Sequence, residues 1–143
     1  MGFAFKKDTG DTRESPAIYV CAQLMDEGAN VCIYDPKVKR EQIIKDLKTV
    51  SRDDPSRVDK LVTIVDDPYE AMNGSHAVAI LTEWEEFRDY DYNKVFATMP
   101  KPACIFDGRN VLDHEKLKAI GFNVQCIGKV MSRAPSHTGG RYD

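Results

Sequence analysis

Apolar residues alternate along the chain between short runs and helical spacing. Ser15-Pro16 combines a favoured helix N-cap with a proline at the first helical position, and apolar residues then recur every three or four positions up to Gly28. The apolar run 31–34 is closed by Asp35-Pro36, which predicts a buried strand. The shorter run 2–5 stops at two lysines and predicts the end of another strand.

The same alternation continues through the rest of the chain. We expect further strands at 61–65, 76–81, 103–106 and 123–127. Helices are predicted at 39–48, 67–73, 91–99 and 113–120, and a solvated loop at 51–59. Six strands alternating with helices predict a Rossmann-like α/β fold, doubly wound around a mostly parallel six-stranded sheet. We expect one domain over residues 1–130 and a disordered tail over 131–143.

Length and composition narrow the class of protein. A chain of 143 residues with 42% hydrophobic residues can form a single packed core. No apolar run approaches the roughly 20 residues of a membrane span, and the first residues lack a signal-peptide pattern. A net charge of −3 gives no broad basic field for nucleic acid. We therefore expect a cytoplasmic protein with no membrane or nucleic-acid partner.

The cysteines and histidines do not suggest a metal site. All four cysteines lie among apolar neighbours, no CxxC occurs, and the three histidines have no ligand spacing. Buried, structural thiols in a reducing compartment are the simplest interpretation. These cysteines are Cys21, Cys32, Cys104 and Cys126.

Cationic residues follow two of the predicted strands. In doubly wound sheets, ligands bind beyond the carboxyl ends of the strands, where strand order reverses. Lys6 and Lys7 follow the first strand, and Arg109 follows the strand at 103–106. If the first strand lies beside the one at 76–81, then Lys6, Arg109 and the loop to Arg13 converge on one crevice. A local cationic site on an acidic protein suits a phosphate-bearing ligand.

Several residues of these loops allow two interpretations. Lys7 is either a solvated charge or a ligand contact. Trp84 either lines a base pocket or anchors its loop on the core. Asp35 stands where an acid binds ribose in NAD-binding Rossmann domains, but the first turn, 2–10, lacks GxGxxG. The sequence therefore favours Asp35 as the cap of its strand.

Five motifs in order resemble a known family. They are GFAFKKDTGDTRESPA at 2–17, YDPK at 34–37, DPYEA at 67–71, LTEW at 81–84 and FDGR at 106–109. Together they resemble the C-terminal, UDP-sugar-binding domain of the UDP-glucose 6-dehydrogenase branch of the UDP-glucose/GDP-mannose dehydrogenase family, most of all in its animal form. The resemblance extends to about Lys129.

The resemblance implies a ligand and roles for four residues. Phe5, Lys6 and Arg109 would bind the UDP-sugar, and Arg13 would face the pyrophosphate of NAD, which another domain mainly binds. Members of the family oxidise UDP-glucose with two NAD and water to UDP-glucuronate, through a thiohemiacetal and a thioester on a cysteine. They assemble as homo-oligomers, either dimers or hexamers.

The chain also departs from the family pattern. In the family, the NAD domain, a long central helix and the catalytic cysteine, lysine and aspartate all precede the segment that matches here. None of the cysteines of this chain matches the nucleophile, so we expect the chain to be inactive alone. Only Met1 precedes Gly2, where family members have several apolar residues, so we expect a cut first strand and a partial chain of low stability.

The sequence leaves two alternative functions open. The chain is either a non-catalytic module that binds UDP-sugar or joins oligomers of the full enzyme, or an NAD-binding domain of another oxidoreductase. The absence of GxGxxG counts against the second alternative.

Overall fold

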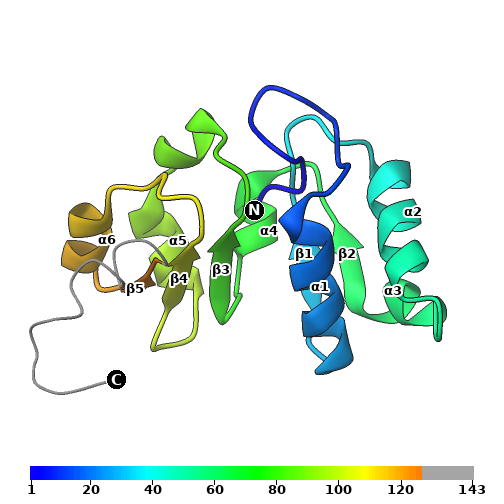
Figure 1. The fold of residues 1–143 in the computed structure, drawn as a ribbon. Helices are drawn as coiled ribbons and strands as arrows, with labels where there is room; N and C mark the ends of the chain where they lie inside the picture. Colours follow the sequence, from blue (N-terminus) through cyan, green and yellow to red (C-terminus); the bar gives the residue numbers. More distant parts are fainter. Residues whose placement is uncertain (127–143) are drawn as a thin grey trace, which may run out of the picture.

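Two parallel sheets lie side by side at the centre of the computed structural model, which describes residues 1–126 (Figure 1). The first pairs β1 (Val31–Ile33) with β2 (Val62–Ile64), and the second has the order β3 (Ala77–Ile80), β4 (Cys104–Asp107), β5 (Asn123–Gln125). The helices are α1 (Pro16–Asp26), α2 (Arg40–Val50), α3 (Ser56–Leu61), α4 (Pro68–Met72), α5 (Tyr92–Thr98) and α6 (His114–Ile120), with a short 3₁₀ helix, η1 (Glu85–Arg88).

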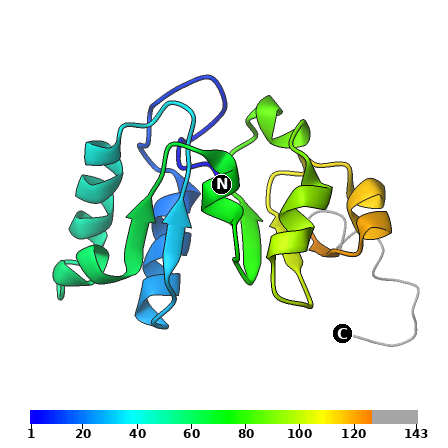
Figure 2. The ribbon, with the colours of Figure 1, turned by 180° about the vertical axis from the view of Figure 1, so that it is seen from behind.

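The helices cover opposite faces of the two sheets. Figure 1 shows α1, α2 and α3 on the near side of β1 and β2, whereas Figure 2, seen from behind, shows α5 and α6 in front of β4 and β5. Parallel pairing with helices on both faces is the doubly wound α/β arrangement. The predicted fold class is therefore confirmed.

The predicted first strand at 2–5 is not formed, so the prediction of six strands in one sheet is wrong for the described residues. Only the start of the segment bridges the two sheets. The Met1 amino group donates to the carbonyl of Ala79 at 2.8 Å, and Met1 accepts from the amide of Leu81 at 2.9 Å. On the other side, the amide of Gly2 donates to the carbonyl of Tyr34 at 2.8 Å.

The backbone leaves the strand direction at Gly2. Its φ of +92° is in the left-handed region, and a Cβ there would lie 2.6 Å from Cβ and Oγ1 of Thr82. The next two amides, those of Phe3 and Ala4, then donate to the carboxylate of Asp35 instead of to a neighbouring strand. A side chain thus takes the place of the strand partner, which is why apolar character alone predicted the wrong structure here.

The other helices and strands lie within a few residues of their predicted positions, with two exceptions. The predicted loop at 51–59 is wrong in its second half because α3 begins at Ser56. Its single buried residue, Val58, packs into the core among charged neighbours, so the segment shows no helical stripe. The 3₁₀ helix η1 was not predicted, and it buries Phe87 completely. The predicted tail at 131–143 lies outside the described residues.

The cysteines differ in burial. Cys21 and Cys126 are buried as predicted, and Cys104 is half-buried, but Cys32 is exposed, so the prediction of burial is wrong for Cys32. In β1 its neighbour Ile33 is buried, and Cys32 points to the opposite face. Within residues 1–126 no group of side chains could hold a metal ion, and each helix is too short or too polar to cross a bilayer.

Thiol labelling of the native protein should follow this burial. We expect Cys32 to react with a disulfide reagent before Cys21, which should react only when the chain unfolds. Burial raises the pKa of the Cys21 thiol to about 11, so both access and thiolate content are low there. Mass spectrometry of the labelled peptides checks the order, and Cys32→Ser should remove the fast phase. A fast phase on Cys21 would contradict the burial of this thiol.

Candidate functional site

Four loops meet beyond the carboxyl ends of the strands. They are residues 3–14, the turn after β1 at Asp35, the segment 81–84 that leads from β3 into η1, and the turn 108–113 after β4. Figure 1 shows the first of these, in dark blue, at the same end of the fold as η1. The predicted site residues lie on these loops.

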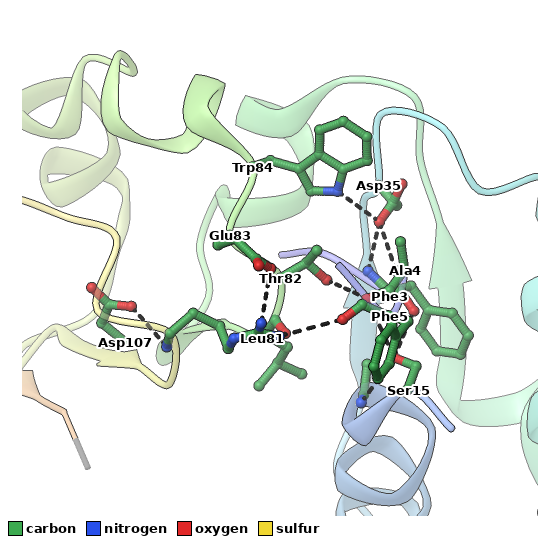
Figure 3. Close-up of polar contacts among 12 residues, drawn as sticks. Phe3, Ala4, Phe5, Ser15, Asp35, Leu81, Thr82, Glu83, Trp84 and Asp107 are labelled. Carbon is green, nitrogen blue, oxygen red and sulfur yellow. Dashed lines mark hydrogen bonds and ion pairs between the residues drawn. The ribbon is translucent and has the colours of Figure 1, made fainter. Parts of the chain in front are cut away.

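The carboxylate of Asp35 holds three of these segments together (Figure 3). Its Oδ2 accepts from the amide of Phe3 at 2.7 Å, the amide of Ala4 at 2.9 Å and Nε1 of Trp84 at 3.2 Å. Its Oδ1 accepts from the amides of Lys37 and Val38 at 2.8 and 3.0 Å. Asp35 is therefore an anchor with both oxygens occupied, in agreement with its interpretation as a cap rather than a ribose ligand.

Trp84 anchors its loop on the core. Its side chain is 8% exposed, and its indole nitrogen is used by Asp35. Of the two interpretations of Trp84, the structure favours the anchor over the base pocket. Thr82, two residues earlier, donates through its buried hydroxyl to the carbonyl of Ala4 at 2.8 Å.

A second buried hydroxyl, that of Ser15, donates to the carbonyl of Phe3 at 2.8 Å. Together with Asp35 and Thr82, it satisfies the amides and carbonyls of Phe3 and Ala4, which are themselves fully buried. The segment that leads into Phe5 and Lys6 is thus fixed from both sides, and the loop that carries the predicted contacts starts from a rigid base.

Asp107, at the end of β4, fixes the turn that carries Arg109. Its side chain is almost completely buried. Oδ1 accepts from the amide of Arg109 at 3.2 Å. Oδ2 accepts from the amides of Val111 and Leu112, each at 2.8 Å, and lies 2.8 Å from Nε2 of His114. The aspartate of the FDGR motif is therefore a structural acceptor that holds the arginine in place.

The guanidinium of Arg109 reaches across to the first loop. Nη1 lies 3.4 Å from the carbonyl oxygens of both Phe5 and Leu81, and Nη2 lies 3.0 Å from Oε1 of Glu83. The structure therefore brings Phe5 and Arg109 together, although 104 positions separate them in the chain. Lys6, next to Phe5, is exposed.

The aromatic ring of Phe5 is unusually open for its type, since the residue is 44% exposed. Its amide donates to the carbonyl of Asp11 at 2.8 Å, which folds the loop back on itself. Phe5 thus offers an exposed apolar ring, while Arg109, which contacts its carbonyl oxygen, and Lys6, the next residue, offer cationic donors. That combination suits a ligand with a planar or sugar portion and an anionic portion.

Arg13 is on the same loop, but its contacts are with Asp11. Nη2 and Nε donate to the two oxygens of that carboxylate at 2.8 and 3.0 Å, and the Arg13 side chain is 87% exposed. Hydrogen bonds from Arg13 lower the pKa of Asp11 to about 2. Lys7 lies 3.4 Å from Glu85 and is half-exposed, so its charge also has a carboxylate partner.

Sequence reasoning missed four residues that build this site. Thr82, Ser15 and Asp107 had been placed only in motifs or at a helix start, and Glu83 had been assigned no partner. Thr82, Ser15 and Glu83 contact segments that are distant in the chain, so their spacing gives no signal, whereas Asp107 acts on the turn that directly follows it. The only available hint was that Thr82 and Asp107 are polar residues directly after predicted buried strands.

Comparisons with known proteins agree with this arrangement. The profile described as "UDP-glucose/GDP-mannose dehydrogenase family, UDP binding domain" matches residues 1–114. The UDP-glucose 6-dehydrogenase of Bos taurus is 59% identical over 136 residues, which cover 92% of this chain and 27% of that protein. The enzyme of the same name from Drosophila melanogaster is 56% identical over 134 residues, covering 93% of this chain and 28% of that protein.

A solved structure shares the fold. The NDP-N-acetyl-D-galactosaminuronic acid dehydrogenase of Methanosarcina mazei Go1 superposes with a TM-score of 0.69 at 24% identity, over 89% of this chain and 23% of that one. The chain spans less than a third of the length of the relatives that it matches. On the profile match and the identity to these relatives, the chain belongs to the UDP-glucose/GDP-mannose dehydrogenase family and matches its UDP-binding domain.

Proposed function

We propose that this chain binds the UDP portion of a UDP-sugar, UDP-glucose or its product UDP-glucuronate, at the loops that carry Phe5, Lys6 and Arg109. The observation that carries the proposal is the position of Arg109, whose backbone amide donates to the buried Asp107 and whose guanidinium lies 3.4 Å from the carbonyl oxygen of Phe5. A guanidinium fixed in this way is suited to phosphate oxygens or sugar hydroxyls.

The whole protein to which this domain corresponds is proposed to be an NAD-dependent UDP-glucose 6-dehydrogenase that works as a homo-oligomer. Bound NAD would supply a hydride acceptor for oxidation of the sugar. Within this chain, the residues fit a contributing contact rather than a dinucleotide site, because the sequence has no GxGxxG and Arg13 offers one exposed guanidinium already paired with Asp11. We propose that NAD is bound mainly elsewhere and that this chain alone does not turn over substrate.

Thermal unfolding of the 143-residue chain with and without UDP tests the binding proposal. Saturation at 100 times the dissociation constant should add about 2.7 kcal/mol to the free energy of unfolding, which raises the melting temperature by several degrees. Arg109→Ala should abolish most of that rise. The matched control is Arg52→Ala, which removes an exposed arginine just after the C-terminal end of α2. This variant should keep the full rise in melting temperature.

A cooperative transition that UDP leaves unmoved would contradict the proposal, as would a shift that Arg109→Ala and Arg52→Ala leave equally large. Production of NADH from UDP-glucose and NAD by this chain alone would overturn the proposal of catalytic incompleteness without touching that of UDP binding.

A further inference from the structure

Three of the cations on the candidate loops are each paired with a carboxylate of the same region. The pairs are Arg109 with Glu83 at 3.0 Å, Arg13 with Asp11 at 2.8 Å, and Lys7 with Glu85 at 3.4 Å. An anionic ligand therefore meets cations whose charges are already balanced. To use one of them fully, the ligand must replace a carboxylate.

The pair of Arg109 and Glu83 differs from the pair of Arg13 and Asp11. Both side chains of the Arg109 pair are only 31% exposed, and Oε1 of Glu83 is shielded from solvent. Although this oxygen is 3.0 Å from Nη2 of Arg109, it accepts no aligned hydrogen bond from any residue in 1–126. Asp11 and Arg13, in contrast, form well-aligned bonds at the surface. Glu83 is thus close enough to balance the charge of Arg109 but is a poorly bonded partner.

The position of Arg109 does not depend on Glu83. Asp107 fixes its backbone amide, and the carbonyl oxygens of Phe5 and Leu81 lie at 3.4 Å from Nη1. Figure 3 shows Phe5, Leu81 and Glu83 on different sides of this contact region. If the carboxylate of Glu83 moves away, these other contacts still hold the guanidinium at the loop, and the donors of Nη2 become available.

We propose that Glu83 is an internal counter-anion that occupies Arg109 in the ligand-free protein and is displaced by a phosphate oxygen of a nucleoside diphosphate. The inference rests on the proposed function and adds a residue that sets affinity by competing with the ligand. A diphosphate carries more negative charge than one carboxylate and brings several acceptor oxygens, so it replaces Glu83 with better hydrogen-bond geometry. The cost of displacing Glu83 reduces the affinity for UDP.

The test compares two glutamates that are two positions apart. Glu83→Gln keeps the size of the side chain and removes the competing charge, so the dissociation constant of UDP should fall about fivefold. Glu85→Gln makes the same change of net charge, but Glu85 pairs with Lys7 and not with Arg109. It should therefore change the dissociation constant of UDP by less than about twofold. Isothermal titration of the 143-residue chain with UDP gives the constants, and uridine serves as the ligand without phosphates.

Three further measurements isolate the contact. Uridine should bind the wild type and Glu83→Gln equally well. In an Arg109→Ala background, Glu83→Gln should no longer improve binding of UDP, because the cation for which they compete is gone. Glu83→Ala provides a second removal of the carboxylate and should also tighten binding of UDP. Thermal unfolding of each variant establishes that it is folded.

The inference is overturned if both Glu83 variants bind UDP no more tightly than the wild type, or if Glu85→Gln gives the same gain and the effect is one of net charge alone. If the wild type binds UDP, neither of these results contradicts the proposed function. If no variant and no wild type binds UDP, the proposed function fails and the inference fails with it.

Discussion

Asp35→Ala should lower the free energy of unfolding by about 3 kcal/mol and weaken binding of UDP as well. The substitution removes the acceptor for the amides of Phe3 and Ala4, both of which belong to fully buried residues, and for the indole of Trp84. It also removes the acceptor for the amides of Lys37 and Val38. Three segments lose their common anchor at once, so the loss should exceed that of an ordinary cap.

The chain contains a matched control in a second Asp-Pro pair that follows a strand. Asp67 caps α4 through one hydrogen bond, to the amide of Tyr69 at 3.0 Å. Asp67→Ala should cost about 1 kcal/mol. Asp35→Asn should also be less stable than the wild type. One of its two side-chain acceptors becomes an NH₂ group, which would face backbone N–H donors. Urea unfolding followed by the fluorescence of Trp84, the only tryptophan, measures all three variants.

Equal losses for Asp35→Ala and Asp67→Ala would contradict the view that Asp35 joins three segments. The matching functional readout is binding of UDP under conditions where both variants are folded. Asp35→Ala should weaken it because Phe5 and Lys6 directly follow the segment that Asp35 holds, whereas Asp67→Ala should leave it unchanged.

The sequence predicted the elements that depend on local spacing. The predictions of α1 and β1 were correct. Capping by Ser15-Pro16 decides where α1 starts, and a short apolar run decides β1. The prediction of a strand at 2–5 was wrong because the amides of Phe3 and Ala4 donate to the carboxylate of Asp35, more than 30 positions away. Hydrophobic periodicity does not identify the acceptor of a backbone amide. An apolar run has the same pattern whether its amides donate to a neighbouring strand or to a side chain.

The candidate site was predicted in part for the same reason. Strand ends identify which loops meet, so the approach of Arg109 to the first loop was expected from the order of the elements, and in the structure Nη1 of Arg109 lies 3.4 Å from the carbonyl oxygen of Phe5. The carboxylates that oppose the cations are different. Nothing in the spacing of Glu83 indicates that it pairs weakly with an arginine of another loop. The charge balance of the site thus had to come from coordinates.

Asp107→Asn should destabilise the protein by about 3 kcal/mol with almost no change in shape. The residue is 1% exposed, its two side-chain oxygens accept from three backbone amides, and Oδ2 lies 2.8 Å from Nε2 of His114. In asparagine one oxygen becomes an N–H donor. Whichever way the amide turns, that donor faces a backbone N–H, and at least one buried amide loses its acceptor.

Asp113→Asn is the matched control, since it makes the same chemical change six positions later at an exposed N-cap, where Asp113 accepts from the amide of Lys116. Asparagine and aspartate cap helices about equally well, so its free energy of unfolding should stay within about 0.5 kcal/mol of the wild type. Urea unfolding compares the two variants. A loss below about 1 kcal/mol for Asp107→Asn would show that the turn tolerates the lost acceptor.

Measuring the binding of UDP by Asp107→Asn then tests whether Asp107, besides stabilising the turn, also positions Arg109 for the ligand. The amide of Arg109 is one of the donors to Asp107, and the guanidinium reaches Phe5 only from that turn. At a temperature where the variant is folded, the dissociation constant of UDP should rise at least about tenfold, since a misplaced guanidinium loses charge-assisted bonds. A folded Asp107→Asn that binds UDP as the wild type does would mean that Arg109 is positioned without the support of Asp107.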